Sequence, residues 1–429
     1  MNSGNTRVIG FWRGWSIAVG CAIGSGIFMM PTLLAPYGML GFGGWIIAGF
    51  GSILVALTMS RLVRRMPKTG GPYVYANEGL GKVAGFIIAW TYWVACIAAV
   101  AGISIAFVGY LGFFFPTITN STVLSLIVSL SLVWSVVTLN IQSLESSSKF
   151  QVISTMLKLL PLILIIFLGL TNFDSANLPE YNPTDTHPIV LLGTVTTLVM
   201  WSFIGIETAT VPADNVINPE ETIPKVLIAS VITILCIYLL VSIAVAAVVP
   251  PNELINSTAP FALAATKVLG LAGGTLISIG ALISTLGSLN ANTLTAGNLS
   301  LAAARDGLLP KTFLYLSKTG TPVFSYVLTG SFVSLLLVLN YTKGLINAFV
   351  FMAMLSTLST LIAYAFCATA ELKFLQIERK STQRTRALIL CLSTLAYSIF
   401  AIWGAGIEII VYSFVLILIG MPIYAFVRN

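Results

Sequence analysis

The chain has 429 residues, of which 57% are hydrophobic and only 8% are charged, and its mean hydropathy is +0.97. Because soluble domains carry about 25% charged residues, this composition excludes a soluble globular protein and predicts a polytopic membrane protein. The formal net charge of +7 would suit an anionic partner such as a nucleic acid, but the placement of the basic residues gives a better explanation.

Twelve apolar stretches are candidate membrane spans. They cover residues 12–36, 40–62, 83–114, 122–141, 150–170, 189–211, 224–249, 271–302, 323–340, 344–370, 387–404 and 409–427. With the N-terminus inside, 18 of the 21 lysines and arginines are cytoplasmic, only Lys267 and Lys343 lie outside, and Lys158 falls within a span. This positive-inside asymmetry predicts twelve spans with both termini cytoplasmic, and it leaves no charge to assign to a nucleic acid.

The sequence shows no pattern typical of metal, disulfide or nucleotide chemistry. All five cysteines lie in apolar stretches, and the single histidine, His187, precedes Pro188 in an expected external loop. No GxxxxGK[ST] motif is present, which argues against an ATP-driven pump. We therefore expect no metal ion and no cofactor, and the candidate residues are too few for an enzyme active site.

Two of the expected spans are interrupted in the same way. The first contains GCAIGSGIFMMP (residues 20–31) and the sixth contains WSFIGIETATVPADN (residues 201–215), about 180 residues apart. Glycine weakens a helix, and a break at membrane depth is tolerated where the backbone lines a cavity. Matching breaks in two halves indicate a secondary transporter with an inverted repeat. The alternative is a helix-packing face at Gly20-x-x-x-Gly24, which would not explain Glu207 in the second break.

The breaks suggest a zwitterionic ligand. An unwound helix exposes N–H groups at the start of its second half, which suit a carboxylate, and carbonyls at the end of its first half, which suit an ammonium group. The expected donors are Gly24, Ser25 and Gly26, and the expected acceptors are Ala22, Trp201 and Ile204.

Lys158 lies about half way along the fifth span, in KFQVISTMLKLLPLILIIFLGL. At about 1.5 Å rise per residue it is too far from either end to reach the interface easily. Burying the charge costs roughly 2.5–3.5 kcal/mol by insertion scales, so it should face a wet cavity or a partner. Two interpretations stay open: a coupling residue of a transporter, or a structural lysine bonded to helix carbonyls.

Several strings resemble the amino acid–polyamine–organocation (APC) transporter superfamily over essentially the whole chain, and within it the bacterial arginine/agmatine and ornithine/putrescine antiporter group. They are GSGIFMMP, TGGPYVYANEGLG, YWVAC, WSFIGIE with NPEETIP, NSTAPFALA and ARDGLLPKTF. The resemblance implies an all-α, LeuT-like fold of twelve transmembrane helices in one unit (1–429), with broken helices 1 and 6. Its parts are two inverted five-helix repeats (12–170 and 189–370) and two additional helices (387–427).

The resemblance also implies roles for individual residues. Ser25 and Gly26 match the carboxylate-binding pair, and the carbonyls of Ala22, Trp201 and Ile204 match the amine site. The gating positions are Tyr92, Glu207, Tyr364 and Trp201, the last as an aromatic lid. The remaining candidate substrate-binding residues are Ile23, Cys96, Phe203, Ser288, Asn292, Phe349 and Ser356. For the aromatic residues, ordinary packing is the alternative.

Two departures from the antiporter group bear on the substrate. The string GSLNAN places Asn292 where that group has a tryptophan stacking on the cationic end of the substrate, so a contact worth about 0.5–2 kcal/mol is missing. Cys21 and Val100 stand where it has asparagines. Lys158 replaces a small apolar residue; proton-coupled and light-chain-type members carry a lysine there, at the sodium site of sodium-coupled relatives. A desolvated lysine can exchange protons and would repel a dication.

A polar stripe on the eighth span, Ser284, Ser288, Asn292 and Thr295, is either a pocket wall or a helix–helix contact. We expect a secondary amino acid transporter for a neutral substrate, working by proton symport or by exchange, in the lipid of a bacterial inner membrane. The alternative on the same fold is a basic amino acid/polyamine antiporter, and a channel or transport-silent sensor is the rival of another class. Protons and a second copy of the chain, as a homodimer, stay open as partners.

Overall fold

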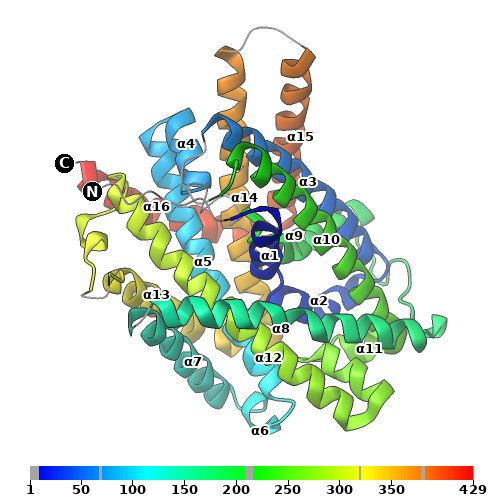
Figure 1. Cartoon of the computed structure of the whole chain (residues 1–429). Helices are drawn as coiled ribbons and strands as arrows, with labels where there is room; N and C mark the ends of the chain where they lie inside the picture. The colour runs from blue at the N-terminus through cyan, green and yellow to red at the C-terminus, as the bar shows by residue number, and fades with distance from the viewer. Residues whose placement is uncertain are drawn as a thin grey trace.

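The computed structural model describes residues 9–66, 70–142, 144–207, 216–317, 320–377 and 382–428. Within these ranges, side chains are not described at positions 17, 21, 25, 144–157, 377, 382 and 428. The described chain is built from helices, and its only paired extended backbone is an isolated bridge between Ile9 and Val216 (Figure 1).

Nine helices in the described ranges are long and apolar enough to cross a membrane. They are α3 (Leu40–Arg65), α5 (Lys82–Leu111), α7 (Thr122–Gln142), α10 (Pro219–Val248), α12 (Pro260–Arg305), α13 (Val323–Asn340), α14 (Leu345–Ile377), α15 (Thr382–Gly404) and α16 (Ile407–Arg428). Each falls on one of the expected spans. The chain is therefore a polytopic all-α membrane protein.

The three other expected spans also coincide with apolar helices, two of them short and the third described with side chains only in part. The first is divided into α1 (Phe11–Ala22) and α2 (Ser25–Leu34), and the sixth consists of α9 (Pro188–Met200) followed by a 3₁₀ turn at Trp201–Phe203. The fifth is α8 (Leu144–Thr171), whose side chains are described from Lys158 onward. The count of twelve spans and the inverted repeat remain predictions, although every expected span has a helix.

Short elements connect these helices. They are the α-helices α4 (Pro72–Leu80), α6 (Pro116–Thr119) and α11 (Pro251–Leu254) and the 3₁₀ turns Ala35–Tyr37, Ser175–Asn177, Lys311–Leu314 and Tyr341–Lys343. The 46-residue α12 is bent at Gly270, whose φ of 64° and ψ of −161° are non-helical. Glycine takes such a positive φ without strain. The expected eighth span, starting at residue 271, begins directly after this bend.

Contacts between distant loops agree with the expected order of spans. The contacts are Ile217 N–H to the Ile9 carbonyl (2.9 Å), Met39 N–H to the Glu180 carbonyl (2.8 Å) and the Tyr73 hydroxyl to the Asp306 carboxylate (2.9 Å). They join segments separated by six, four and six expected spans. An even number of crossings returns the chain to the same side of the membrane, so these pairs fit the order predicted from the sequence.

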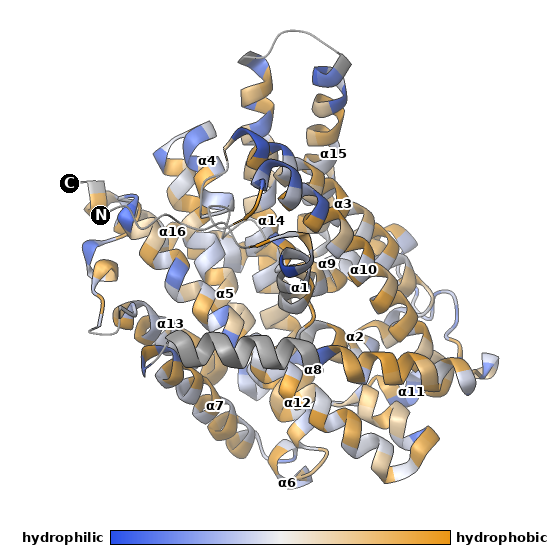
Figure 2. Ribbon diagram, viewed as in Figure 1, coloured by the Kyte–Doolittle hydropathy of each residue, from blue (hydrophilic) through white to orange (hydrophobic). Residues whose placement is uncertain are grey.

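The core lies around α5. In its most apolar stretch 89% of the residues are buried, against 17% for α16, and α5 packs on α14 and α12. A helix that is hydrophobic all round belongs in an interior, whereas apolar outward faces in a membrane protein meet lipid. Figure 2 shows such hydrophobic outer faces on α7 and on the described half of α8. Helices α14 and α15 extend together beyond the rest of the molecule (Figure 1).

Candidate functional site

The first predicted break is present between α1 and α2. Helix α1 ends at Ala22, Ile23 is extended with ψ at 97°, and Gly24 has φ −141° and ψ −148° before α2 begins. A side chain at Gly24 would not fit, because its Cβ would lie 2.6 Å from the Ser288 hydroxyl of α12. The first N–H groups of α2 have no intrahelical acceptors, which is the arrangement that binds an anion.

The second predicted break follows α9. After the 3₁₀ turn at Trp201–Phe203, Ile204 is extended with ψ at 137° and Gly205 has φ at 109°. Such a φ strongly favours glycine. The N–H of Gly205 donates to the Glu207 carboxylate at 3.0 Å, so the glutamate side chain caps its own break. Residues 208–215, the remainder of the predicted interrupted segment, lie outside the described residues.

The two breaks lie against each other. A Cβ built on Gly26 would be 2.7 Å from the Ser202 hydroxyl oxygen and 2.9 Å from the Trp201 ring. The Ser202 hydroxyl is buried and has no hydrogen-bond partner among the described residues. An unpaired buried hydroxyl costs free energy, so a polar ligand atom arriving beside Gly26 would satisfy it.

A cavity of about 440 Å³, including its opening, lies next to the second break. It is lined by α5, the break itself, α12 and α14. The lining residues are Tyr92, Ala95, Cys96, Ala99, Ile204, Gly205, Ala291, Asn292, Thr295, Ser356 and Thr360. The mixture of apolar and hydroxyl or amide groups along this wall is typical of a small-molecule site.

Trp201 and Phe349, here the aromatic end, lie beyond one end of the cavity and are not among its lining residues. Their rings meet edge to face with centroids 6.1 Å apart. Gly102 of α5 faces the same indole, since its Cβ would lie 3.7 Å from Trp201. Gly102 follows the cavity residues of α5 in sequence, and Phe349 precedes those of α14. The aromatic end therefore lies on one side of the cavity residues in both helices.

The other end, here the carboxylate end, is formed by Tyr92 and Glu207. The Tyr92 hydroxyl donates to Glu207 at 2.6 Å, and the glutamate is only 2% exposed. The buried hydroxyl of Tyr364 interacts electrostatically with Glu207, without a hydrogen bond among the described residues. Tyr92 is the first cavity residue of α5, and Tyr364 follows those of α14. The cavity thus lies between an aromatic end and a carboxylate end.

Lys158 is fully buried behind the first break. Its ammonium group donates to the Gly20 carbonyl of α1 at 2.9 Å and to the Ser288 hydroxyl of α12 at 3.1 Å. The Ser288 hydroxyl in turn donates to the Ser284 carbonyl at 3.1 Å. The lysine therefore connects three helices at the level where α1 unwinds.

The structure places five of the predicted site residues in the cavity wall: Tyr92, Cys96, Ile204, Asn292 and Ser356. Of the polar stripe on α12, Asn292 and Thr295 face the cavity, whereas Ser288 contacts Lys158. The residues of the stripe therefore belong to two places, the cavity wall and the contact with Lys158. The side chain of Ser25 lies outside the described residues.

Three predicted contacts look different in the structure. The ring of Phe203 packs in the core against Trp45 and Tyr238, so its side chain is not part of the cavity wall. The Ala22 carbonyl accepts a hydrogen bond from the Tyr238 hydroxyl at 3.0 Å, which leaves one lone pair for a ligand. Ile23 is buried at the break without lining the cavity.

Sequence reasoning missed Tyr238, Ser202 and Thr360. Ser202 sits inside the quoted string WSFIGIE and could have been chosen as a hydroxyl next to a break. Thr360 is one helical turn beyond Ser356 and lines the same cavity, so the i, i+4 spacing gave a signal. Tyr238 lies in an uninterrupted apolar helix, and no local pattern distinguishes it.

Comparison with known proteins settles the family. The sequence profile of the amino acid permease family matches residues 9–428. The chain belongs to the amino acid permease family. It is a membrane transporter of the APC superfamily rather than an enzyme.

Three curated relatives of this permease illustrate what it is similar to. A putrescine transporter of Haemophilus influenzae is 28% identical over 94% of this chain and 93% of its own. An arginine/ornithine antiporter of Pseudomonas aeruginosa is 28% identical over 96% and 89%. A cadaverine/lysine antiporter of Escherichia coli is 29% identical over 74% and 71%. These relatives support the resemblance to the antiporter group that the sequence motifs indicated.

Proposed function

We propose that the chain exchanges a small amine-bearing substrate across a bacterial inner membrane by alternating access. The observation that carries the proposal is the cavity enclosed between the aromatic end and the carboxylate end, at the junction of two broken helices. The bacterial origin of the relatives supports the choice of membrane, and the asymmetry of basic residues supports cytoplasmic termini.

In this proposal the first turn of α2 binds the substrate carboxylate through the N–H groups of Ser25 and Gly26, where the substrate has one. The unpaired Ser202 hydroxyl adds a third donor. The carbonyls of Trp201 and Ile204, and the remaining lone pair of Ala22, accept from the amine. These groups are neutral dipoles fixed by the fold, so little reorganisation is needed when a substrate binds.

The two ends of the cavity act as gates. Opening the carboxylate end requires the Tyr92–Glu207 hydrogen bond to break or to move as a unit, together with Tyr364. Opening the aromatic end requires Trp201 to leave Phe349. The residues of both ends are buried in this structure.

For the substrate class, the comparisons support a basic amino acid or a polyamine better than the neutral amino acid expected from the sequence. The names of the three relatives refer to putrescine, to arginine with ornithine, and to cadaverine with lysine. The cavity offers the means to hold a cationic tail: the Glu207 carboxylate lies behind Tyr92, and Ser356 and Cys96 line the wall. The relatives also favour exchange over symport, and proton symport remains a prediction.

A neutral amino acid is the second candidate, on the ground of two observations. The described residues that line the cavity carry no positive or negative side chain and no tryptophan, since Asn292 stands at the expected stacking position. Lys158 adds a buried positive charge near the cavity, because its ammonium group contacts Ser288, one helical turn from the cavity residue Asn292. This charge disfavours a dicationic ligand.

Counterflow in proteoliposomes tests both candidates. Vesicles loaded with one unlabelled compound are given a trace of labelled arginine, putrescine or leucine outside, and accumulation is followed. Strong accumulation with arginine, ornithine, lysine, agmatine, putrescine or cadaverine supports the first candidate. Accumulation restricted to alanine, serine and leucine supports the second. No counterflow with any of these compounds would contradict the proposed exchange and favour a channel or a sensor.

A further inference from the structure

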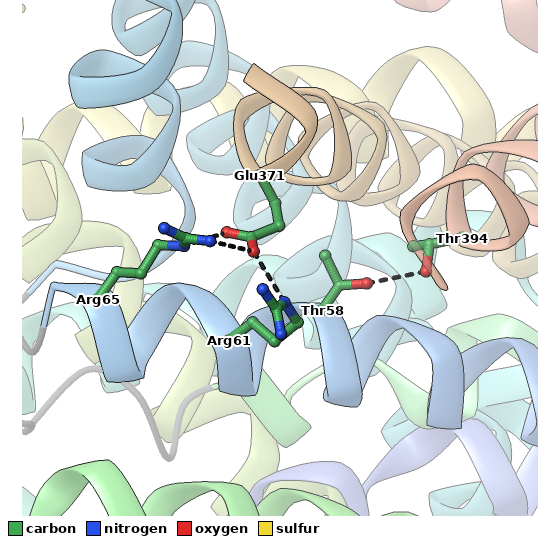
Figure 3. Close-up of polar contacts among 5 residues, drawn as sticks. All are labelled: Thr58, Arg61, Arg65, Glu371 and Thr394. Carbon is green, nitrogen blue, oxygen red and sulfur yellow. Dashed lines mark hydrogen bonds and ion pairs between the residues drawn. The ribbon is translucent and has the colours of Figure 1, made fainter. Parts of the chain in front are cut away.

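A third buried charged side chain lies outside the candidate site, near one end of the bundle. Glu371 of α14 is fully buried, and three N–H groups of two α3 arginines occupy both of its carboxylate oxygens (Figure 3). Arg61 donates to one oxygen at 2.8 Å, and Arg65 donates to both, at 2.8 and 3.0 Å. The guanidinium of Arg65 also lies 5.8 Å from the ring centroid of Phe374, on the same helix as Glu371.

The position of Glu371 relates it to the carboxylate end of the cavity. It follows Tyr364 by seven residues, which is about two helical turns, so the two side chains share one face of α14 about 10 Å apart along the axis. Tyr364 interacts with Glu207, and Glu371 interacts with α3. The same face of α14 is thus held at the carboxylate end and again just beyond it, on the side away from the cavity.

The chemistry of this ionic contact means that the second attachment is either fully made or fully broken. A buried carboxylate cannot leave both guanidinium groups without being hydrated, and breaking such a pair on one side is strongly unfavourable. Arginine stays charged at any physiological pH, so the pair cannot be released by proton loss from that side. The arginine side chains are 30% and 24% exposed, which gives water a route to the pair when α14 moves.

We propose that Arg61, Arg65 and Glu371 form an ionic latch that positions α14 against α3 and thereby keeps the carboxylate end of the cavity closed. The latch residues are positioning residues, since they do not line the cavity. The inference rests on the proposed gating role of Tyr92, Glu207 and Tyr364. Opening at this end would separate Glu371 from α3, and closure would restore all three N–H to carboxylate bonds.

Native Cys96 provides a reporter, because it lines the cavity. We would measure the rate of Cys96 alkylation by a membrane-impermeant maleimide, resolved by peptide mass spectrometry, in right-side-out and in inverted membrane vesicles without substrate. Glu371→Gln should accelerate alkylation about tenfold in inverted vesicles alone, because the predicted topology places the α3 arginines on the cytoplasmic side. An unchanged rate in both orientations, or acceleration only in right-side-out vesicles, would overturn the proposal.

Matched variants distinguish loss of the latch from a general weakening of the packing around α3. Thr58→Val removes a 2.9 Å hydrogen bond from the same face of α3 to Thr394 of α15, without touching α14, and should leave the rate unchanged. The double variant Arg65→Glu with Glu371→Arg keeps two arginines and one glutamate and should restore slow alkylation. If Glu371→Gln does not fold, Arg61→Gln tests the same latch with the Arg65 pair intact. Acceleration by Thr58→Val equal to that of the latch variant would contradict the inference.

Counterflow of the unmodified protein, measured alongside, tests the proposed exchange separately. The alkylation rate reports access to the cavity and needs no transported substrate. Altered alkylation with failed counterflow would therefore keep the latch and overturn the exchange, and the converse result would do the opposite.

Discussion

The protein buries a charge in two different ways. Lys158 donates to a carbonyl and to a hydroxyl, which are neutral oxygens, whereas Glu371 is held by two guanidinium groups. A hydroxyl can also donate, so Ser288 could hydrogen-bond a lysine that has lost its proton. The arginines at Glu371 can only donate hydrogen bonds and stay charged, so they cannot adapt in this way. The comparison teaches that one buried charge contacts neutral groups, one of which can donate as well as accept a hydrogen bond, whereas the other is held by side chains of fixed opposite charge.

The largest effect should come from replacing Lys158, which tests whether the two buried charges differ in this way. Lys158→Ala should fold, because the lost charge takes its desolvation penalty with it. Uptake driven by a pH gradient should fall by on the order of tenfold or more and lose its pH dependence, while some exchange persists. Lys158→Arg, which keeps the charge but cannot release a proton, should not rescue the pH dependence. Uptake with and without an imposed pH gradient measures both variants.

Two outcomes would change this interpretation of Lys158. An unaltered pH profile in Lys158→Ala would refute a coupling role. Loss of monodisperse protein in Lys158→Ala, with full rescue by Lys158→Arg, would identify the lysine as a structural contact between α1, α8 and α12. Glu371→Gln serves as the matched control and should retain the pH dependence of uptake.

The next prediction concerns Gly26 of α2. It lies in the first broken helix, whose other half, α1, accepts a hydrogen bond from Lys158. Gly26→Val should abolish substrate binding, because even a Cβ would lie 2.7 Å from the Ser202 hydroxyl. The informative variant is Gly26→Ala, tested with an amino acid and with its decarboxylated amine. A carboxylate site predicts a selective loss for the amino acid. Equal losses for both ligands in a binding assay would show that Gly26 is needed for packing against Trp201 and Ser202 instead.

Asn292→Trp tests the part of the cavity next to the Lys158 contact. Asn292 lines the cavity and lies one helical turn from Ser288 on α12. A tryptophan there should raise affinity for arginine or agmatine by up to ~2 kcal/mol, or about thirtyfold, if a cationic tail enters this part of the cavity. Asn292→Leu, an apolar substitution without a π face, is the control. Competition of labelled substrate binding by each compound gives the affinities. An equal gain in both variants would rule out a cation–π contact.

Ser288→Ala tests the neutral partner of Lys158 by itself. It removes a hydrogen bond to a charged group, worth about 1.5–3 kcal/mol, but keeps the Gly20 carbonyl as acceptor. We expect a several-fold fall in gradient-driven uptake and a displaced pH profile, with counterflow less affected. Thr295→Val, on the same helix but facing the cavity, should leave the pH profile in place. A displaced profile in Thr295→Val as well would argue against a specific role for Ser288.

The smallest effect should come from the latch arginines. Arg65 makes two hydrogen bonds to Glu371 and Arg61 makes one, so Arg65→Lys should lower thermal stability more than Arg61→Lys, by about 1 kcal/mol. Both lysine variants keep the charge, so the pH dependence of uptake should not change. Thermal unfolding in detergent compares them. Equal stabilities would indicate that charge alone, without the bidentate geometry, holds Glu371.

The sequence predicted the substrate class less well than the family. Asn292 and Lys158 favoured a neutral amino acid, whereas the relatives favour the basic amino acid or polyamine alternative. One wall residue and one charge cannot define a binding site, because affinity depends on every group that the cavity presents. Ser356 and Cys96 also line the cavity, with the Glu207 carboxylate behind Tyr92, and only the packing of α5 and α14 brings them together.

Properties that depend on local sequence were determined by the sequence itself. Hydropathy fixed the membrane class and located a helix at every expected span, and glycines at 24 and 205 located both breaks, because burial in lipid and backbone freedom act residue by residue. Side-chain partners were decided by the tertiary structure alone. Trp201 and Phe203 are two residues apart, yet one pairs with Phe349 of α14 and the other packs against Trp45 of α3. Glu371 meets arginines more than 300 positions away, a pairing that exists only once α3 and α14 have packed.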